Sequence, residues 1–69
     1  MKIDIDKEAD AAYIYVKSHI KDGEVAKTIE VNNNIILDFD ADEKLIGIEI
    51  LNASKNLTRD FLSSVVQRG

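Results

Sequence analysis

The chain has 69 residues, 45% of them hydrophobic, and its 13 acidic and 9 basic side chains give a formal net charge of −4. This length allows one small domain, residues 1–69, whose core must be thin because a chain of roughly 60 residues buries only about 60% of its unfolded surface. The absence of cysteine excludes disulfides and thiolate chemistry, the single histidine excludes multi-histidine zinc sites, and the acidic balance argues against nucleic acid as a partner.

Apolar and polar residues alternate with a period of two through the first fifty residues, which is typical of strands with one buried face. Helical spacing of three and four residues occurs only near the C-terminus, where Ser54 or Thr58 is suited to cap a helix. The residues with this spacing are Leu57, Phe61, Leu62, Val65 and Val66. The predicted elements in chain order are strands at about 2–6, 11–17, 25–31, 35–40 and 45–51, and a helix at about 54–67.

The first and last hairpins can be tested by parity, because a slip of one residue turns every side chain of a strand to the opposite face. A first hairpin with loop 7–10 pairs Ile5 with Ala12 and Ile3 with Ile14. A last hairpin with loop 41–44 also gives apolar pairs on one face: Phe39 with Ile46, Leu37 with Ile48 and Ile35 with Ile50. This register sets Gly47 opposite Asp38, which predicts a bulge or a close approach of another group at the glycine.

A loop of three asparagines, 32–34, separates the third and fourth strands, and we expect an asparagine there to adopt the left-handed conformation. The pairs that follow are Val31 with Ile35 and Ile29 with Leu37. Lys27 then lies on the core side near Phe39, where an edge strand would let its ammonium reach solvent. The three turns therefore agree on one apolar face.

These patterns predict an α+β fold, an antiparallel β-meander of about five strands with one C-terminal α-helix packed on one face. The polar segment 18–23 reads as a connection. No apolar run approaches the roughly 20 residues that span a bilayer. The N-terminal residues Met1–Asp4 also lack the apolar core of a signal peptide, so we expect a cytoplasmic location and no membrane partner.

The acidic segment around the last hairpin resembles a calcium-binding loop in the spacing of its carboxylates. Asp38, Asp40, Asp42 and Glu49 fall at the first, third, fifth and twelfth positions of such a loop. The sixth position, which needs glycine for a sharp turn, is Glu43, and the flanks read as strands rather than helices. A solvated acidic turn without a bound metal is the preferred interpretation, and a divalent-metal binder is kept as the alternative.

One face of the predicted sheet gathers acidic residues, tyrosines and an isoleucine. Its members are Asp4, Asp6, Tyr13, Tyr15, Ile36, Asp38, Asp40 and Glu49, with Glu30 beside them. Such a face is suited to dock a basic protein, since complementary charge raises the encounter rate, and the plain alternative is an ordinary solvent-exposed sheet face. A protein partner is therefore expected, bound through this face or through the C-terminal helix, and a homodimer is a further alternative because a thin core gains from association.

Nothing in the sequence points to catalysis. Paired carboxylates need a concave, water-poor site to shift their pKa values, and a small sheet with one helix offers little concavity. His19 has no sequence neighbour of the triad type, and the three glycines are scattered rather than gathered in a phosphate loop. We therefore predict a protein that is not an enzyme, with no catalytic residues and no cofactor.

Two segments carry a resemblance to a known family: residues 1–14, MKIDIDKEADAAYI, and residues 37–51, LDFDADEKLIGIEIL, followed by Ala53, Ser54 and Lys55. They resemble a family of very small bacterial and archaeal proteins, the domain of unknown function family number 2283. The chain departs from it at Glu43, where the family commonly has glycine, and at Asn52, where it has aspartate. The resemblance implies a small strand-rich domain without an established activity, catalytic residue or cofactor. Because such proteins tend to lie beside genes for small toxin-like proteins, it also implies an antitoxin-like role.

Overall fold

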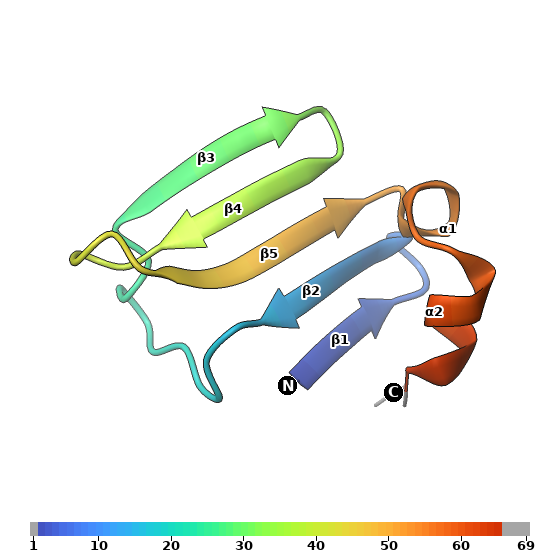
Figure 1. Ribbon diagram of the computed structural model, residues 1–69, viewed down its shortest axis with the longest axis horizontal. Coiled ribbons are helices and arrows are strands. Elements are labelled where there is room, and N and C mark those ends of the chain that lie inside the picture. The colour runs from blue at the N-terminus through green and yellow to red at the C-terminus, as the bar shows by residue number, and fades with distance from the viewer. Residues whose placement is uncertain (1, 66–69) are drawn as a thin grey trace.

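The computed structural model describes residues 2–65 and contains a five-stranded antiparallel sheet with two short helices at one end (Figure 1). The elements are β1 (Lys2–Asp6), β2 (Ala11–Tyr15), β3 (Lys27–Asn32), β4 (Ile35–Phe39), β5 (Leu45–Leu51), α1 (Ala53–Asn56) and α2 (Arg59–Ser64). The predicted α+β class and the antiparallel sheet are confirmed. Among residues 2–65, no helix has the length and apolar character needed to cross a membrane.

The last strand lies in the middle of the sheet, whose order is β1-β2-β5-β4-β3. The pairs β1–β2, β3–β4 and β4–β5 are the predicted hairpins, while β2 pairs with β5 rather than with the next strand in the chain. The connection 16–26, drawn in teal, runs around the end of the sheet that lies away from the helices (Figure 1). The two outer hairpins are thus held together through β5.

The predicted registers of the first and last hairpins hold through most of their length. Partners such as Ile3 with Ile14 and Leu37 with Ile48 face each other as expected. The predicted pair of Phe39 with Ile46 is wrong, because the register shifts after Asp38 and Phe39 pairs with Leu45. Such a bulge sets two residues of one strand against one of its partner.

The loop between β3 and β4 is one residue shorter than predicted. Ile29 pairs with Leu37 as expected, but a register shift after Glu30 pairs Ile35 with Asn32 instead of Val31. The Asn32 side chain accepts hydrogen bonds from the backbone N–H groups of Asn34 and Ile35, at 2.7 and 2.9 Å. This side-chain turn replaces the predicted left-handed asparagine: the non-glycine residues with positive φ in 2–65 are Asp10, Glu43 and Asn52.

Strand ends depart from prediction by one or two residues. The predicted strand 11–17 ends at Tyr15, 25–31 becomes Lys27–Asn32, and 35–40 ends at Phe39. The last correction has a clear cause in Asp40. Its carboxylate accepts hydrogen bonds from the backbone N–H groups of Asp42 and Lys44, both at 2.9 Å, and so begins the turn.

The single helix predicted at 54–67 is wrong within the described residues, since two helices separated at Leu57 and Thr58 take its place. The Thr58 side chain caps α2 by accepting from the backbone N–H of Phe61, so one of the two predicted caps is confirmed. The other, Ser54, is instead held by the Asp10 carboxylate, which accepts from both its backbone N–H and its hydroxyl. Val66 and the rest of the predicted helix beyond residue 65 lie outside the described residues.

The core is small and lies at the helical end of the sheet. Ala53 of α1 packs against Ala12 and Ile50, and partly buried Ile5, Ile35, Ile48 and Leu57 surround this cluster. Ile46 is the other buried hydrophobic residue of the described chain. The thin core expected from the chain length is therefore present. The predicted position of Lys27 opposite Phe39 is confirmed, on an exposed edge strand.

We predict that Glu43→Gly raises the free energy of unfolding by about 1 kcal/mol, since a side chain in the left-handed region is strained and glycine is not. Glu43 has φ of 62° in the turn between β4 and β5. Urea unfolding followed by circular dichroism measures the change. Asp42→Gly is the matched control in the same turn, where φ is not positive, and it should lower stability because glycine adds freedom to the unfolded chain. Equal effects of the two substitutions would contradict the prediction.

Candidate functional site

The predicted acidic face is assembled on one side of the sheet. A cross-strand row runs from edge to edge through all five strands: Asp4, Tyr13, Glu49, Ile36 and Glu30. The neighbouring row contains Lys2, Tyr15, Gly47, Asp38 and Thr28. We call these two rows the polar face. It brings together six of the eight predicted face residues.

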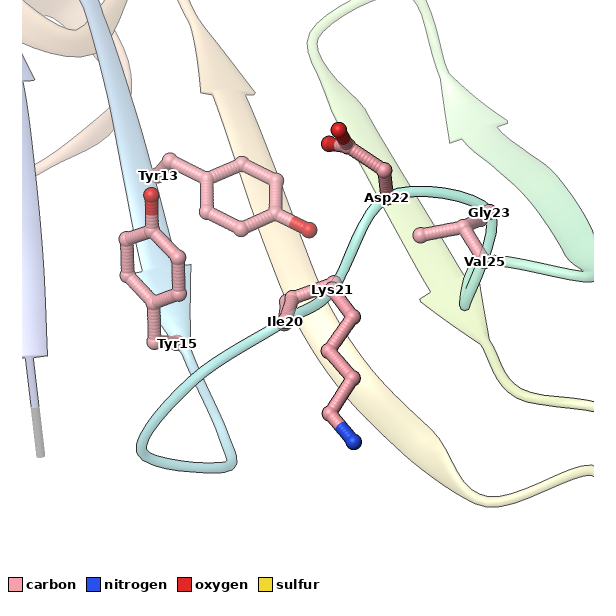
Figure 2. Close-up of a pocket in the computed structure, with 7 residues that line it drawn as sticks. All are labelled: Tyr13, Tyr15, Ile20, Lys21, Asp22, Gly23 and Val25. Carbon is pink, nitrogen blue, oxygen red and sulfur yellow. The ribbon is translucent and has the colours of Figure 1, made fainter.

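Tyr13 ties this face together across the central strand. Its hydroxyl donates to Asp38 Oδ2 at 2.7 Å, and Thr28 Oγ1 donates to Asp38 Oδ1 at 2.8 Å. The Tyr13 ring lies across β5 (Figure 2) and directly over Gly47, where an added Cβ would overlap the phenol oxygen. The predicted close approach at Gly47 is confirmed, and the group that approaches is this ring.

Tyr15 sits beside Tyr13 on the same strand, with its hydroxyl donating to Asp4 Oδ2 at 3.1 Å. The ring centroids are 4.9 Å apart at an interplanar angle of 69°, the edge-to-face geometry that aromatic quadrupoles favour. The Lys2 ammonium lies 4.6 Å from the centroid of the Tyr15 ring. This face therefore already holds one cation against an aromatic ring.

Both phenols are held in their protonated form. Burial, the hydrogen bond to Asp38 and the negative charges nearby raise the pKa of Tyr13 well above its ordinary value. Burial and the hydrogen bond to Asp4 raise the pKa of Tyr15 in the same direction. At neutral pH the two hydroxyls are donors to carboxylates, and neither is poised to act as a base.

An open hollow of about 380 Å³ lies between the two tyrosines and the β2–β3 connection (Figure 2). The residues that line it are Tyr13, Tyr15, Ile20, Lys21, Asp22, Gly23 and Val25. An ion pair of Lys17 with Glu24 holds this connection, and Glu24 also accepts from the backbone N–H of Lys21 at 2.8 Å. These two bonds lower the pKa of the Glu24 carboxyl. Sequence reasoning missed the hollow, because the segment 18–23 carries no periodicity that would place it against the sheet.

The remaining acidic residues singled out from the sequence serve turns. Asp6 accepts from the backbone N–H groups of Glu8 and Ala9, both at 3.1 Å, and Asp40 closes the β4–β5 turn as described above. These two carboxylates were expected on the acidic face. They lie at its ends and are bonded to their own loops.

The four carboxylates of the metal-binding alternative are not brought together as ligands. Asp38 is bonded to Tyr13 and Thr28, Asp40 to its own turn, and Glu49 lies in the row with Tyr13, while Asp42 is exposed in the loop. Within residues 2–65, no group of three or more His, Cys, Asp or Glu side chains is placed to hold a metal ion. No arrangement of described residues therefore favours the metal-binding alternative.

Comparison with known proteins gives two matches. A family described as "Protein of unknown function (DUF2283)" matches residues 2–54. An uncharacterized protein of Methanocaldococcus jannaschii is 42% identical over 55 residues, which are 80% of this chain and 43% of that protein. This chain thus spans less than half the length of that relative. No solved structure matches this chain.

We predict that Gly47→Ala lowers the free energy of unfolding by about 1–3 kcal/mol, because the new methyl group must displace the Tyr13 ring. The overlap with that ring is direct. Chemical denaturation of the single variants and of the double variant with Tyr13→Ala measures the coupling. Without the ring, Gly47→Ala should be neutral or stabilising, since alanine is less flexible than glycine in a strand. An undiminished loss in the Tyr13→Ala background would show that the ring is not the obstacle.

Stability should also fall at alkaline pH in a way that depends on Tyr13. The unfolded phenol ionises near its ordinary pKa of 10.0 and the folded one only at higher pH. The unfolded state therefore loses its proton first, and stability decreases as the pH rises above about 10. Tyr13→Phe should flatten this decrease, and Tyr15→Phe should flatten it less. Urea unfolding at pH values from about 8 to about 11 provides the comparison, and an unchanged slope in Tyr13→Phe would contradict the assignment.

Proposed function

We propose that this chain is a non-catalytic cytoplasmic module that binds a basic protein through its polar face. The chain belongs to the family of proteins of unknown function whose model matches residues 2–54. The family resemblance drawn from the sequence is confirmed by that match, and the family brings with it no assigned activity.

The observation that carries the proposal is the pairing of two tyrosine rings with carboxylates around an open hollow. Tyr13 and Tyr15 line the hollow, and Asp38 and Asp4 accept hydrogen bonds from their hydroxyls. Aromatic faces beside carboxylates attract lysine and arginine side chains through both the ring quadrupole and direct charge. Lys2, already seated over Tyr15, supports this reading from within the chain.

The charge of the polar face favours a partner of opposite sign. Its two rows hold the carboxylates of Asp4, Glu30, Asp38 and Glu49 against the single ammonium of Lys2. A surface of this kind speeds the encounter with a basic protein and selects against acidic ones. Ile36 and the two rings add apolar area between the charges, as in the centre of protein interfaces.

A binding role is also more consistent with this surface than a catalytic one. The two phenols are kept protonated and are already bonded to carboxylates, and the hollow is open to solvent. General acid–base catalysis calls for a group with a pKa near the working pH in a site that excludes water. The antitoxin-like role implied by the family resemblance falls within the proposal, since a basic toxin is one partner that such a face would bind.

Titration of the ¹⁵N-labelled protein with a short lysine- and arginine-rich peptide tests the proposal. We expect saturable chemical-shift changes at Tyr13, Tyr15 and Glu49, and binding that weakens as salt is added because exposed charges are screened. Glu49→Gln should weaken binding by roughly tenfold, the loss of one charge contact of about 1.4 kcal/mol.

Asp60→Asn is the matched control, because it removes one negative charge from α2, which lies at the helical end of the sheet and outside the two rows of the polar face (Figure 1). It should leave the affinity nearly unchanged. A peptide of equal length with glutamate in place of the basic residues should not bind. Shift changes spread over all acidic residues, or equal effects of Glu49→Gln and Asp60→Asn, would overturn the proposal and leave only a general attraction of opposite charges.

A further inference from the structure

Among residues 2–65, the face of the sheet opposite the polar face is apolar, and the helices cover only one end of it. A row of branched side chains crosses it from edge to edge: Ile3, Ile14, Ile48, Leu37 and Ile29. We call this the apolar row. The helices lie at one end of the strands (Figure 1), where Ala53 and Leu57 cover the neighbouring row around Ala12 and Ile50. An antiparallel sheet with one solvated face normally packs its other face against a second layer.

Exposure values show how incomplete that second layer is. Ile29 is 40% exposed and Val16 at the end of β2 is 46% exposed, while the other members of the apolar row are half-buried. Scattered exposed hydrophobic residues need no explanation, but a contiguous apolar patch marks an interaction surface. The uncovered part of the apolar face begins beyond the residues that α1 contacts and extends to the ends of the strands that lie away from the helices.

The chain exposes more surface than a compact monomer of its mass. Its accessible surface is 5111 Å², about 800 Å² more than the roughly 4,300 Å² expected of a compact monomer of this mass. The radius of gyration of 12.2 Å likewise exceeds the roughly 11 Å expected for this length. A standard interface buries about 800 Å² on each partner, so one such interface would bring the exposed surface of the chain to the value of a compact monomer.

We infer that a second copy of this chain covers the apolar face, forming a two-fold dimer in which two five-stranded sheets pack face to face. A chain with a net charge of −4 repels its own copies, unless the surfaces that meet carry little charge. The strand carboxylates lie on the polar face or at the turns, and Lys27 is the charged strand residue on the apolar side among those described. The two sheet faces can therefore meet here without bringing strand carboxylates together.

The position of the helices fixes how the two copies are related. With the two-fold axis between the sheets and perpendicular to the strands, the helical end of each copy lies over the open end of its partner. Each open end carries Val16 and Phe39, and α1 already covers the other end of the same face. An axis along the strands would instead press the two helical ends against each other. Sheets stacked this way lie about 10 Å apart, as in β-sandwiches.

The edges of the sheet are less suited to self-association than its face. β3, one edge, is interrupted by a bulge after Glu30, and β1, the other edge, alternates its isoleucines with Lys2, Asp4 and Asp6. Bulges and charges on edge strands are the usual obstacles to strand-to-strand pairing. This contrast makes the face the surface that a second copy covers.

Light scattering coupled to size-exclusion chromatography tests the inference on the wild-type chain, for which we expect twice the chain mass of 7.7 kDa. Ile29→Lys places a charge in the apolar row at an exposed position and should raise the dimer dissociation constant by at least about tenfold. Glu30→Gln is the matched control, since it is the next residue of β3, points to the polar face and changes the net charge by the same amount. It should leave the dimer intact.

Circular dichroism verifies that Ile29→Lys remains folded, and Val16→Lys provides a second variant at an exposed site of the same face. Hydrogen exchange separates face packing from edge pairing, because a face-to-face dimer leaves the outward amides of β3 unprotected. A wild-type monomer at its highest soluble concentration, a dimer unaffected by both lysine variants, or protected outward amides of β3 would overturn the inference. The basic-peptide titration tests the polar face on the other side of the sheet. The dimer and the binding of a basic protein can therefore fail independently of each other.

Discussion

The pairing of β5 on both sides is the constraint on which the rest of the structure depends. Among the described strands, β5 alone pairs with a strand of each hairpin, β2 on one side and β4 on the other, and the Tyr13–Asp38 hydrogen bond links the two hairpins across it. Its alternating side chains set both faces: Ile48 and Ile50 point to the core, while Gly47 and Glu49 point to the polar face. A one-residue slip of this strand would bury Glu49 and expose two isoleucines at once.

Much of this arrangement could be predicted from the sequence, because the alternation of side chains between the two faces of a strand is a local property. The first and last turns specify which residues face each other, and Ile3 with Ile14 or Leu37 with Ile48 are found as predicted. The bulges after Asp38 and Glu30 could not be predicted, since a bulge changes the pairing without changing the alternation. The strand order could not be predicted either, because the polar segment 18–23 does not indicate where in the sheet the third strand lies. The predicted helix is interrupted at Thr58, which caps α2, although the apolar residues on both sides of it keep the helical spacing. The spacing alone therefore could not reveal the break.

For the candidate site as well, the sequence predicts which residues share a face but not which of them are in contact. Alternation alone places Tyr13, Glu49 and Asp38 on one face, and the structure has them there. Which of them touch depends on the order of the strands. Tyr13 reaches Asp38 only because β5 lies between their strands and contributes a glycine at the crossing point. The hollow beside the tyrosines depends on the β2–β3 connection, so a pattern confined to strands could not reveal it.

The two proposed surfaces have a joint consequence, because they lie on opposite sides of one sheet. If two apolar faces pack together, both polar faces point outward, and the dimer presents two acidic, tyrosine-bearing surfaces related by a two-fold axis. A basic partner with repeated binding segments would engage both, and the second contact would form at a high effective concentration. Weak binding at a single hollow would then suffice for a stable complex. The sheet that leaves one domain with a thin core is the same sheet that allows the dimer to be bivalent.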